Sequence, residues 1–150
     1  MKKIRTSYLA VIVVLWMVAA TAMADGHAIG AKVMDFTVPI TSVTYHPTKT
    51  VINLQSDGAL GEMGVVGATV TLEVPVSQNP VAGLYTSQGA AFRPDDKVIT
   101  FSGRGTWKAI GKHRWRLNGT SVNTEGTRTY LSSVLSLDGM SISGTVFSMD

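Results

Sequence analysis

Side chains that could act in catalysis or bind a metal are few and scattered in this chain. Its three histidines are His27, His46 and His113, and their spacing matches no metal-ligand pattern. His27, with Asp25 and a free α-amino group at a new N-terminus, could take up a metal only adventitiously. The chain has no cysteine, which excludes thiol catalysis, thiolate metal sites and iron–sulfur clusters. The sequence therefore predicts no metal and no cofactor.

Motifs for nucleophilic catalysis and phosphate binding are also missing. The segment Tyr85-Thr86-Ser87-Gln88-Gly89 lacks the first glycine of a Gly-x-Ser-x-Gly elbow. Gly103-Arg104-Gly105 lies within a strand pattern and not before a helix, so it is no phosphate loop. We expect a protein that is not an enzyme. A cofactor-independent cyclase or isomerase remains the alternative, with His113 as its one inward polar candidate.

The most informative segment is an expected hairpin over residues 97–122, in which alternate side chains share a face. If its strands pair around Gly111, Trp107 lies opposite Trp115 and Gly105 lies opposite Leu117. The inward glycines either let the strand bend or leave room for a ligand, and the tryptophans form either core or a ligand platform. The candidate ligand-lining residues are Phe101, Gly103, Gly105, Trp107, Trp115 and Leu117.

The other face of the same hairpin is basic. A solvated basic face discourages pairing between sheets of different molecules. The same charges could instead meet an acidic partner, such as anionic lipid headgroups or lipopolysaccharide. This candidate surface, here called the basic patch, comprises Arg104, Lys108, Lys112, Arg114 and Arg116.

The elements that must position these residues are strands. Val66, Ala68, Val70 and Leu72 alternate with Gly67, Thr69 and Thr71, which is typical of a sheet with one face on a core. Consecutive short hairpins favour an all-β antiparallel meander that closes into a small up-and-down barrel of about eight strands, whereas a two-sheet sandwich is the alternative. Strands are expected near 33–38, 42–46, 50–55, 66–76, 82–92, 97–110, 113–122, 129–137 and 140–148.

The first residues predict export. Lys2, Lys3 and Arg5 precede an apolar run and the small residues of Ala22-Met23-Ala24, which is typical of a cleaved bacterial signal peptide. We expect a signal peptide over 1–24, a flexible arm over 25–32 and one barrel domain over 33–150, in the periplasm or outside the cell. Three of the 13 basic residues would leave with the signal, so ten basic face ten acidic residues, without the excess that nucleic-acid binding needs.

The late glycine motifs carry a family resemblance. Gly103-Arg104-Gly105-Thr106-Trp107-Lys108, with Trp115-Arg116, Leu137-Asp138-Gly139 and Gly144-Thr145-Val146, resembles small exported bacterial proteins with a lipocalin-like or allene-oxide-cyclase-like barrel. The resemblance covers about residues 83–147 and implies a calycin-type barrel. Classical lipocalins carry their Gly-x-Trp near the N-terminus, whereas Gly105-Thr106-Trp107 lies late.

Taken together, these patterns predict a barrel that binds a small apolar or amphipathic ligand in its interior. The alternatives are the cyclase or isomerase and an interaction module that uses the basic patch. No second long apolar run follows the signal, so no transmembrane helix is expected after cleavage. An outer-membrane barrel is disfavoured because the chain ends Phe147-Ser148-Met149-Asp150, without the usual terminal aromatic.

Overall fold

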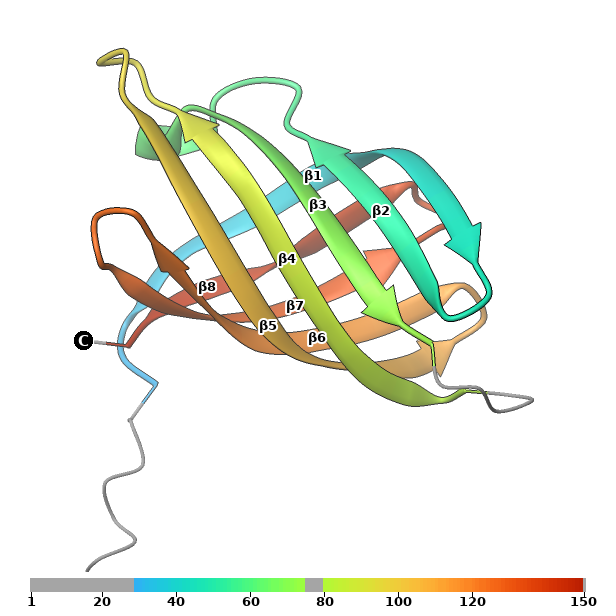
Figure 1. The fold of residues 1–150 in the computed structure, drawn as a ribbon. Helices are drawn as coiled ribbons and strands as arrows, with labels where there is room; N and C mark the ends of the chain where they lie inside the picture. Colours follow the sequence, from blue (N-terminus) through green and yellow to red (C-terminus); the bar gives the residue numbers. More distant parts are fainter. Residues whose placement is uncertain (1–28, 75–79, 150) are drawn as a thin grey trace, which may run out of the picture.

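The computed structural model describes residues 29–74 and 80–149. The expected signal peptide and the first four residues of the expected arm lie outside this part of the chain, as do residues 75 and 76 of the strand expected over 66–76. Within the described residues, the chain forms a closed barrel of eight antiparallel strands in meander order (Figure 1). The barrel, and not the two-sheet sandwich, is therefore the fold.

Each strand pairs with the next along the chain, and β8 closes the barrel by pairing with β1. One short 3₁₀ helix, η1, interrupts the connection between β2 and β3. The elements are β1 (Lys32–His46), β2 (Lys49–Gln55), η1 (Gly61–Met63), β3 (Val65–Glu73), β4 (Ala82–Phe92), β5 (Val98–Gly111), β6 (Arg114–Asn123), β7 (Arg128–Ser136) and β8 (Ser141–Ser148).

The first strand corrects one expectation. The segments 33–38 and 42–46, expected as two strands, belong to the single strand β1. The pairing with β2 shifts between Ile40 and Ser42, which marks a bulge within β1. A bulge bends a strand sharply without ending it. The first half of β1 therefore pairs with β8, and the second half pairs with β2.

The seam between β1 and β8 begins before the strand itself. The Gly30 amide donates to the Ser148 carbonyl, and the Ser148 amide donates to the Ala31 carbonyl. Further along, the Thr145 hydroxyl donates to the Asp35 carboxylate at 2.7 Å. Hydrogen bonds from Lys32 and then from Thr145 lower the pKa of Asp35 below its usual value.

Register corrects a second expectation, in the β5–β6 hairpin. Trp107 pairs with Leu117, Ala109 pairs with Trp115, and Gly105 pairs with Gly119. The tryptophans are therefore not opposite each other. The two-residue shift arises from the irregularity between Ala109 and Gly111, together with a two-residue turn. Because the shift is even, the side chains within the two paired strands keep their expected faces.

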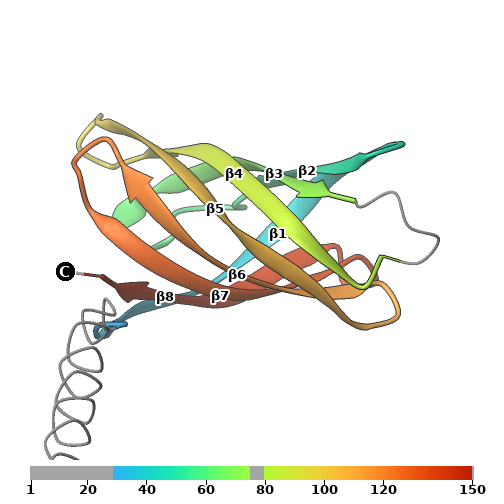
Figure 2. The ribbon, with the colours of Figure 1, turned by 60° about the horizontal axis from the view of Figure 1, so that its bottom comes forward.

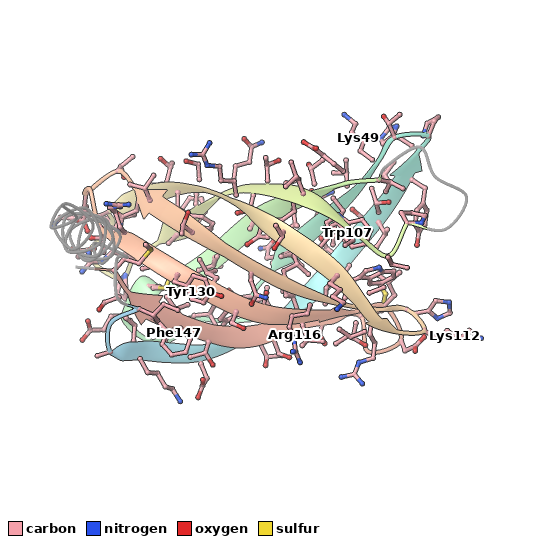
Figure 3. All side chains as sticks on the ribbon, turned by 90° about the horizontal axis from the view of Figure 1, so that it is seen from below. Lys49, Trp107, Lys112, Arg116, Tyr130 and Phe147 are labelled. Atoms are coloured by element: carbon pink, nitrogen blue, oxygen red, sulfur yellow. The ribbon has the colours of Figure 1, made fainter. Side chains whose placement is uncertain are left out.

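The two ends of the barrel differ. At one end, Trp107 is 3% exposed, and its indole Nε1 donates to the Glu73 carbonyl at 3.0 Å. Figure 3 shows Trp107 near the Lys112 turn, at the end away from Phe147. The opposite end carries the β2–β3, β4–β5 and β6–β7 connections and the last residues of β8, as Figures 1 and 2 show. We call these the closed end and the open end.

The buried core follows the predicted alternation. Inward side chains from all eight strands pack in one cluster. Its members are Val38, Ile40, Ile52, Leu54, Val70, Leu72, Tyr85, Trp107, Leu117, Leu135 and Ile142. Over residues 29–74 and 80–149, no helix has the length and apolar character needed to cross a membrane.

Candidate functional site: an apolar cavity at the open end

The barrel interior is hollow toward the open end. The cavity has a volume of about 370 Å³ and draws its lining from all eight strands. Most of the lining is aliphatic or aromatic, and Val66, Ile99, Phe101, Leu131 and Val146 are typical members. A volume of this size lies at the lower end of the range for small-molecule sites.

The mouth of the cavity is formed by the three connections at the open end. Leu60, Glu62 and Met63 come from the β2–β3 connection, Arg93 follows β4, and Glu125 belongs to the β6–β7 loop. Charged side chains in the lining are confined to this mouth, and the remainder of the described lining is neutral. An apolar ligand part would therefore lie inside, with any charged part at the rim.

Arg93 connects the loops around the mouth. Its guanidinium lies 3.7 Å from the Glu125 carboxylate and 3.7 Å from the Asp95 carboxylate. Neither approach is short enough for a hydrogen bond, and the buried Nε has no partner among the described residues. The Asn123 side-chain oxygen, in contrast, accepts from the Glu125 and Thr127 amides and fixes the β6–β7 loop.

Aromatic rings from adjacent strands lie over three of the inward glycines. A Cβ built on Gly105 would lie 2.7 Å from Tyr85 Cε1, and one built on Gly83 would lie 2.7 Å from Trp107 Nε1. A Cβ on Gly89 would lie 2.5 Å from Phe101 Cζ. Each ring thus covers a glycine on a neighbouring strand, an arrangement that compensates for the missing side chain.

The structure divides the predicted ligand-lining residues into two groups. Phe101 and Leu117 line the cavity. Trp107 is buried at the closed end, Trp115 packs partly buried against the same core, and Gly103 and Gly105 lie between these and the cavity wall. None of these last four residues is in the cavity lining.

His113 does not face the cavity. It lies in the β5–β6 turn at the closed end, with a positive φ of 56°, and its side chain is exposed. Its Nδ1 lies 2.8 Å from an Asp138 carboxylate oxygen in the β7–β8 turn. The cyclase or isomerase alternative therefore loses the one inward polar candidate that the sequence offered for it. Among the described residues, no group of three His, Cys, Asp or Glu side chains could hold a metal ion.

The basic patch lies outside the barrel, on β5, β6 and the turn between them. All five side chains are exposed, and Lys108 pairs directly with Arg116. Figure 3 shows Arg116 and Lys112 pointing away from the barrel. Within residues 29–74 and 80–149, none of the five forms an ion pair. The strands β4 to β8 contain no aspartate or glutamate.

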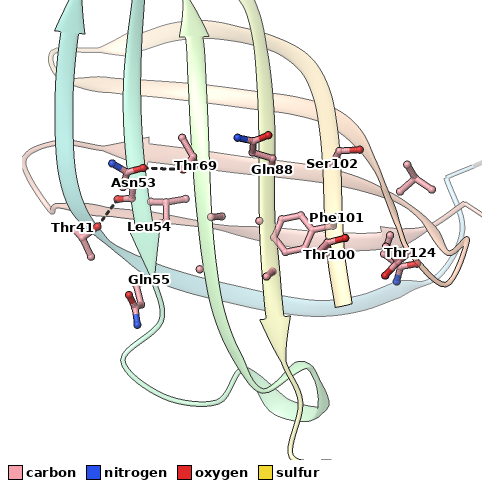
Figure 4. A pocket seen from close by; sticks show the side chains of 16 residues that line it. Thr41, Asn53, Leu54, Gln55, Thr69, Gln88, Thr100, Phe101, Ser102 and Thr124 are labelled. Carbon is pink, nitrogen blue, oxygen red and sulfur yellow. Dashed lines mark hydrogen bonds between the residues drawn. The ribbon is translucent and has the colours of Figure 1, made fainter. Parts of the chain in front are cut away.

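A second hollow, of about 820 Å³, lies across β1 to β6 (Figure 4). Its lining is an even mixture of polar and apolar surface, and it is broadly open to solvent. The Thr69 hydroxyl donates to the Asn53 side-chain oxygen at 2.8 Å, and the Thr41 hydroxyl donates to the Asn53 carbonyl at 3.1 Å. These groups already satisfy one another, and the interior cavity is more apolar and less open to solvent, so the interior cavity is the better candidate site.

Sequence reasoning missed Tyr85 and Arg93. Tyr85 shares the parity of Gly83, Ser87 and Gly89 on β4, so alternation over 82–92 could have placed it inside. Arg93 follows the strand and reaches the mouth only through the β4–β5 loop, for which periodicity gives no signal. Comparison with protein-family models, curated proteins and solved structures finds no match to this chain.

Proposed function

We propose that this chain is an exported barrel protein that binds a small apolar or amphipathic ligand in the cavity at its open end. The observation that carries the proposal is the cavity of about 370 Å³, lined mostly by apolar side chains and reaching the surface beside Arg93 and Glu125. Transfer of an apolar ligand from water into this lining is favourable by about 25 cal/mol for each Å² buried. The charged rim can remain hydrated while an apolar part is enclosed.

A filled cavity tests this proposal. Leu131 lines the cavity and Ser132 is the next residue on β7, facing outward. We expect Leu131→Trp to weaken binding of 2-ethylnaphthalene at least about tenfold, because the indole occupies the ligand's space. Ser132→Trp adds the same ring outside the barrel and should leave affinity unchanged. Equilibrium dialysis measures both. Unchanged binding by Leu131→Trp, or no binding by the unaltered protein, contradicts the proposal.

The proposal of export has a separate test. Mass spectrometry of the protein recovered from the producing cell should show an N-terminus at Asp25 and material outside the cytoplasm. A full-length N-terminus on all recovered protein would contradict export and leave the cavity's binding function unaffected.

A second candidate function rests on the basic patch. Its side chains form no ion pair with the described acidic residues, and Leu84 and Ile110 beside them on β4 and β5 are 57% and 40% exposed. Basic charge next to exposed apolar side chains is suited to an anionic lipid surface. We propose that the patch docks the barrel on such a surface.

Vesicle sedimentation tests this docking. The double variant Arg114→Ser/Arg116→Ser should bind vesicles of phosphatidylglycerol and phosphatidylcholine about tenfold more weakly, since each basic residue contributes about 1 kcal/mol near an anionic surface. Lys49→Ser/Lys97→Ser removes the same charge elsewhere and should bind almost as well as the unaltered protein. Equal losses in the two variants would show a net-charge effect only and overturn the docking surface.

A further inference from the structure

The interior of the cavity contains one phenol. Tyr85 lies in the middle of β4, is 5% exposed and contributes to the cavity lining. Its ring lies over Gly105 on β5, and its hydroxyl lies beside Gly119 on β6. A Cβ at Gly105 would collide with the ring and one at Gly119 would collide with the hydroxyl, so the two glycines make room for the phenol.

The Tyr85 hydroxyl makes no hydrogen bond with another described residue, and it is not among the fully enclosed unpaired atoms, so it is open to the cavity that Tyr85 lines. A hydroxyl in this position is free to donate to a group that enters the cavity. Burial raises the pKa of Tyr85 to about 12, with a smaller contribution from Tyr130. The phenol therefore stays protonated at neutral pH and can donate.

Other hydroxyls also contribute to the neutral lining, among them those of Ser87 and Ser133. Ser133 is 6% exposed on β7, and Ser87 is the next inward residue after Tyr85 on β4. Neither hydroxyl forms a hydrogen bond with another residue in the described part of the chain. Ser121 also lines the cavity, but its hydroxyl donates to the Ser102 carbonyl.

The charge distribution restricts the ligand group that this region can accept. Glu62, Arg93 and Glu125 are the charged residues of the described lining, and all belong to the mouth. A buried anion beside Tyr85 would have no cation to offset its desolvation, which is costly. A neutral oxygen, by comparison, needs only one donor.

We propose that Tyr85 donates a hydrogen bond to a neutral oxygen, a carbonyl or hydroxyl, of an apolar ligand that enters with that oxygen directed inward. This inference rests on the proposed binding function and narrows its ligand class to small, oxygen-bearing, uncharged apolar molecules. Ser87 and Ser133 provide additional polar contacts for the same end of the ligand.

Two probes of similar shape separate this hydrogen bond from apolar burial. The probes are 2-acetylnaphthalene, which has a carbonyl oxygen, and 2-ethylnaphthalene, which has none. We expect Tyr85→Phe to weaken binding of 2-acetylnaphthalene about three- to tenfold, the value of one net hydrogen bond. Binding of 2-ethylnaphthalene should be unchanged, because Tyr85→Phe keeps the ring over the glycines. Equilibrium dialysis gives both dissociation constants.

Tyr130→Phe is the matched control. Tyr130 faces outward on β7 and packs against Phe147, with ring centroids 6.2 Å apart, so its hydroxyl cannot reach a cavity ligand. Loss of its hydroxyl should change neither dissociation constant. An independent reading comes from the infrared carbonyl band of bound 2-acetylnaphthalene, which should lie at lower frequency in the unaltered protein than in Tyr85→Phe.

The possible outcomes are distinguishable. Equal effects of Tyr85→Phe on the two probes, or no effect on the ketone and its carbonyl band, would overturn the hydrogen bond while the binding function stands. If the unaltered protein binds neither probe, the proposed function fails and the inference fails with it.

Discussion

The closed and open halves of the barrel interior are built from the same alternating strands but differ in packing. In the closed half, Ile52 and Leu135 are 1% and 0% exposed, and Trp107 fills the space between them and the end of the barrel. In the open half, Ile99 and Leu131 are only half-buried and line a cavity. Alternation thus decides which side chains point inward, and their sizes decide whether the inside is filled.

Two leucines on one strand provide the sharpest test of this difference. Leu135 lies in the closed half and Leu131, two inward positions earlier on β7, lines the cavity. We expect Leu135→Ala to lower the free energy of unfolding by about 2–5 kcal/mol, because a new void opens in a packed core. Leu131→Ala only enlarges an existing hollow and should cost at least about 1 kcal/mol less. Urea denaturation with a shared m-value measures both.

Equal costs for the two leucines would break the comparison. That result would mean that the open half is as tightly packed in solution as the closed half, and the cavity would no longer be a candidate binding site. A smaller cost at Leu131 that grows when 2-ethylnaphthalene is added would sharpen the comparison, because a bound ligand adds contacts with that side chain.

The glycines show what sequence could and could not predict. Parity placed Gly103 and Gly105 inward correctly, and the closed eight-stranded meander was predicted correctly. The residue that pairs with Gly105 was predicted wrongly, because the irregularity near Gly111 shifts the register of the β5–β6 hairpin by two residues. The ring of Tyr85 over Gly105 was also missed, since it comes from the preceding strand and no local pattern records how far a side chain reaches.

The hollow itself could not be predicted for a related reason. A period of two gives the direction of each side chain but not the volume left between eight strands. The small side chains of Ala68 and Ser121 point inward in the open half, whereas the large side chains of Trp107 and Leu135 point inward in the closed half. That contrast emerges only when register and closure place the residues in layers, and the mouth depends further on loops such as that of Arg93.

Glycine substitutions test the role of the inward glycines. A Cβ at Gly105 would collide with the Asn118 carbonyl, with Gly119 and with the Tyr85 ring, whereas one at Gly67 on β3 would meet nothing within 4 Å. Gly105→Ala should therefore destabilise the barrel by about 1–3 kcal/mol through overpacking. Gly67→Ala should be neutral or slightly stabilising, because glycine weakens a strand interior. Thermal unfolding followed by circular dichroism compares the two, and equal midpoints would contradict the contact between Tyr85 and Gly105.

Alkaline pH tests the burial of Tyr85, with a smaller expected effect. Its folded-state pKa is raised to about 12 from 10, so between pH 10 and pH 12 the unfolded chain loses a proton that the folded protein keeps. Unfolding is therefore favoured as pH rises, and the free energy of unfolding falls by about 1.4 kcal/mol between pH values below 10 and pH 11.

Tyr85→Phe should lack this pH-dependent contribution, while Tyr130→Phe, which keeps Tyr85, should retain it. Urea denaturation at pH 9 and pH 11 measures the difference, and parallel declines in the unaltered protein and Tyr85→Phe would mean that the phenol is in contact with water. Such a result would also remove the reason to expect a ligand oxygen as its partner, because a hydrated hydroxyl at the cavity wall is already satisfied.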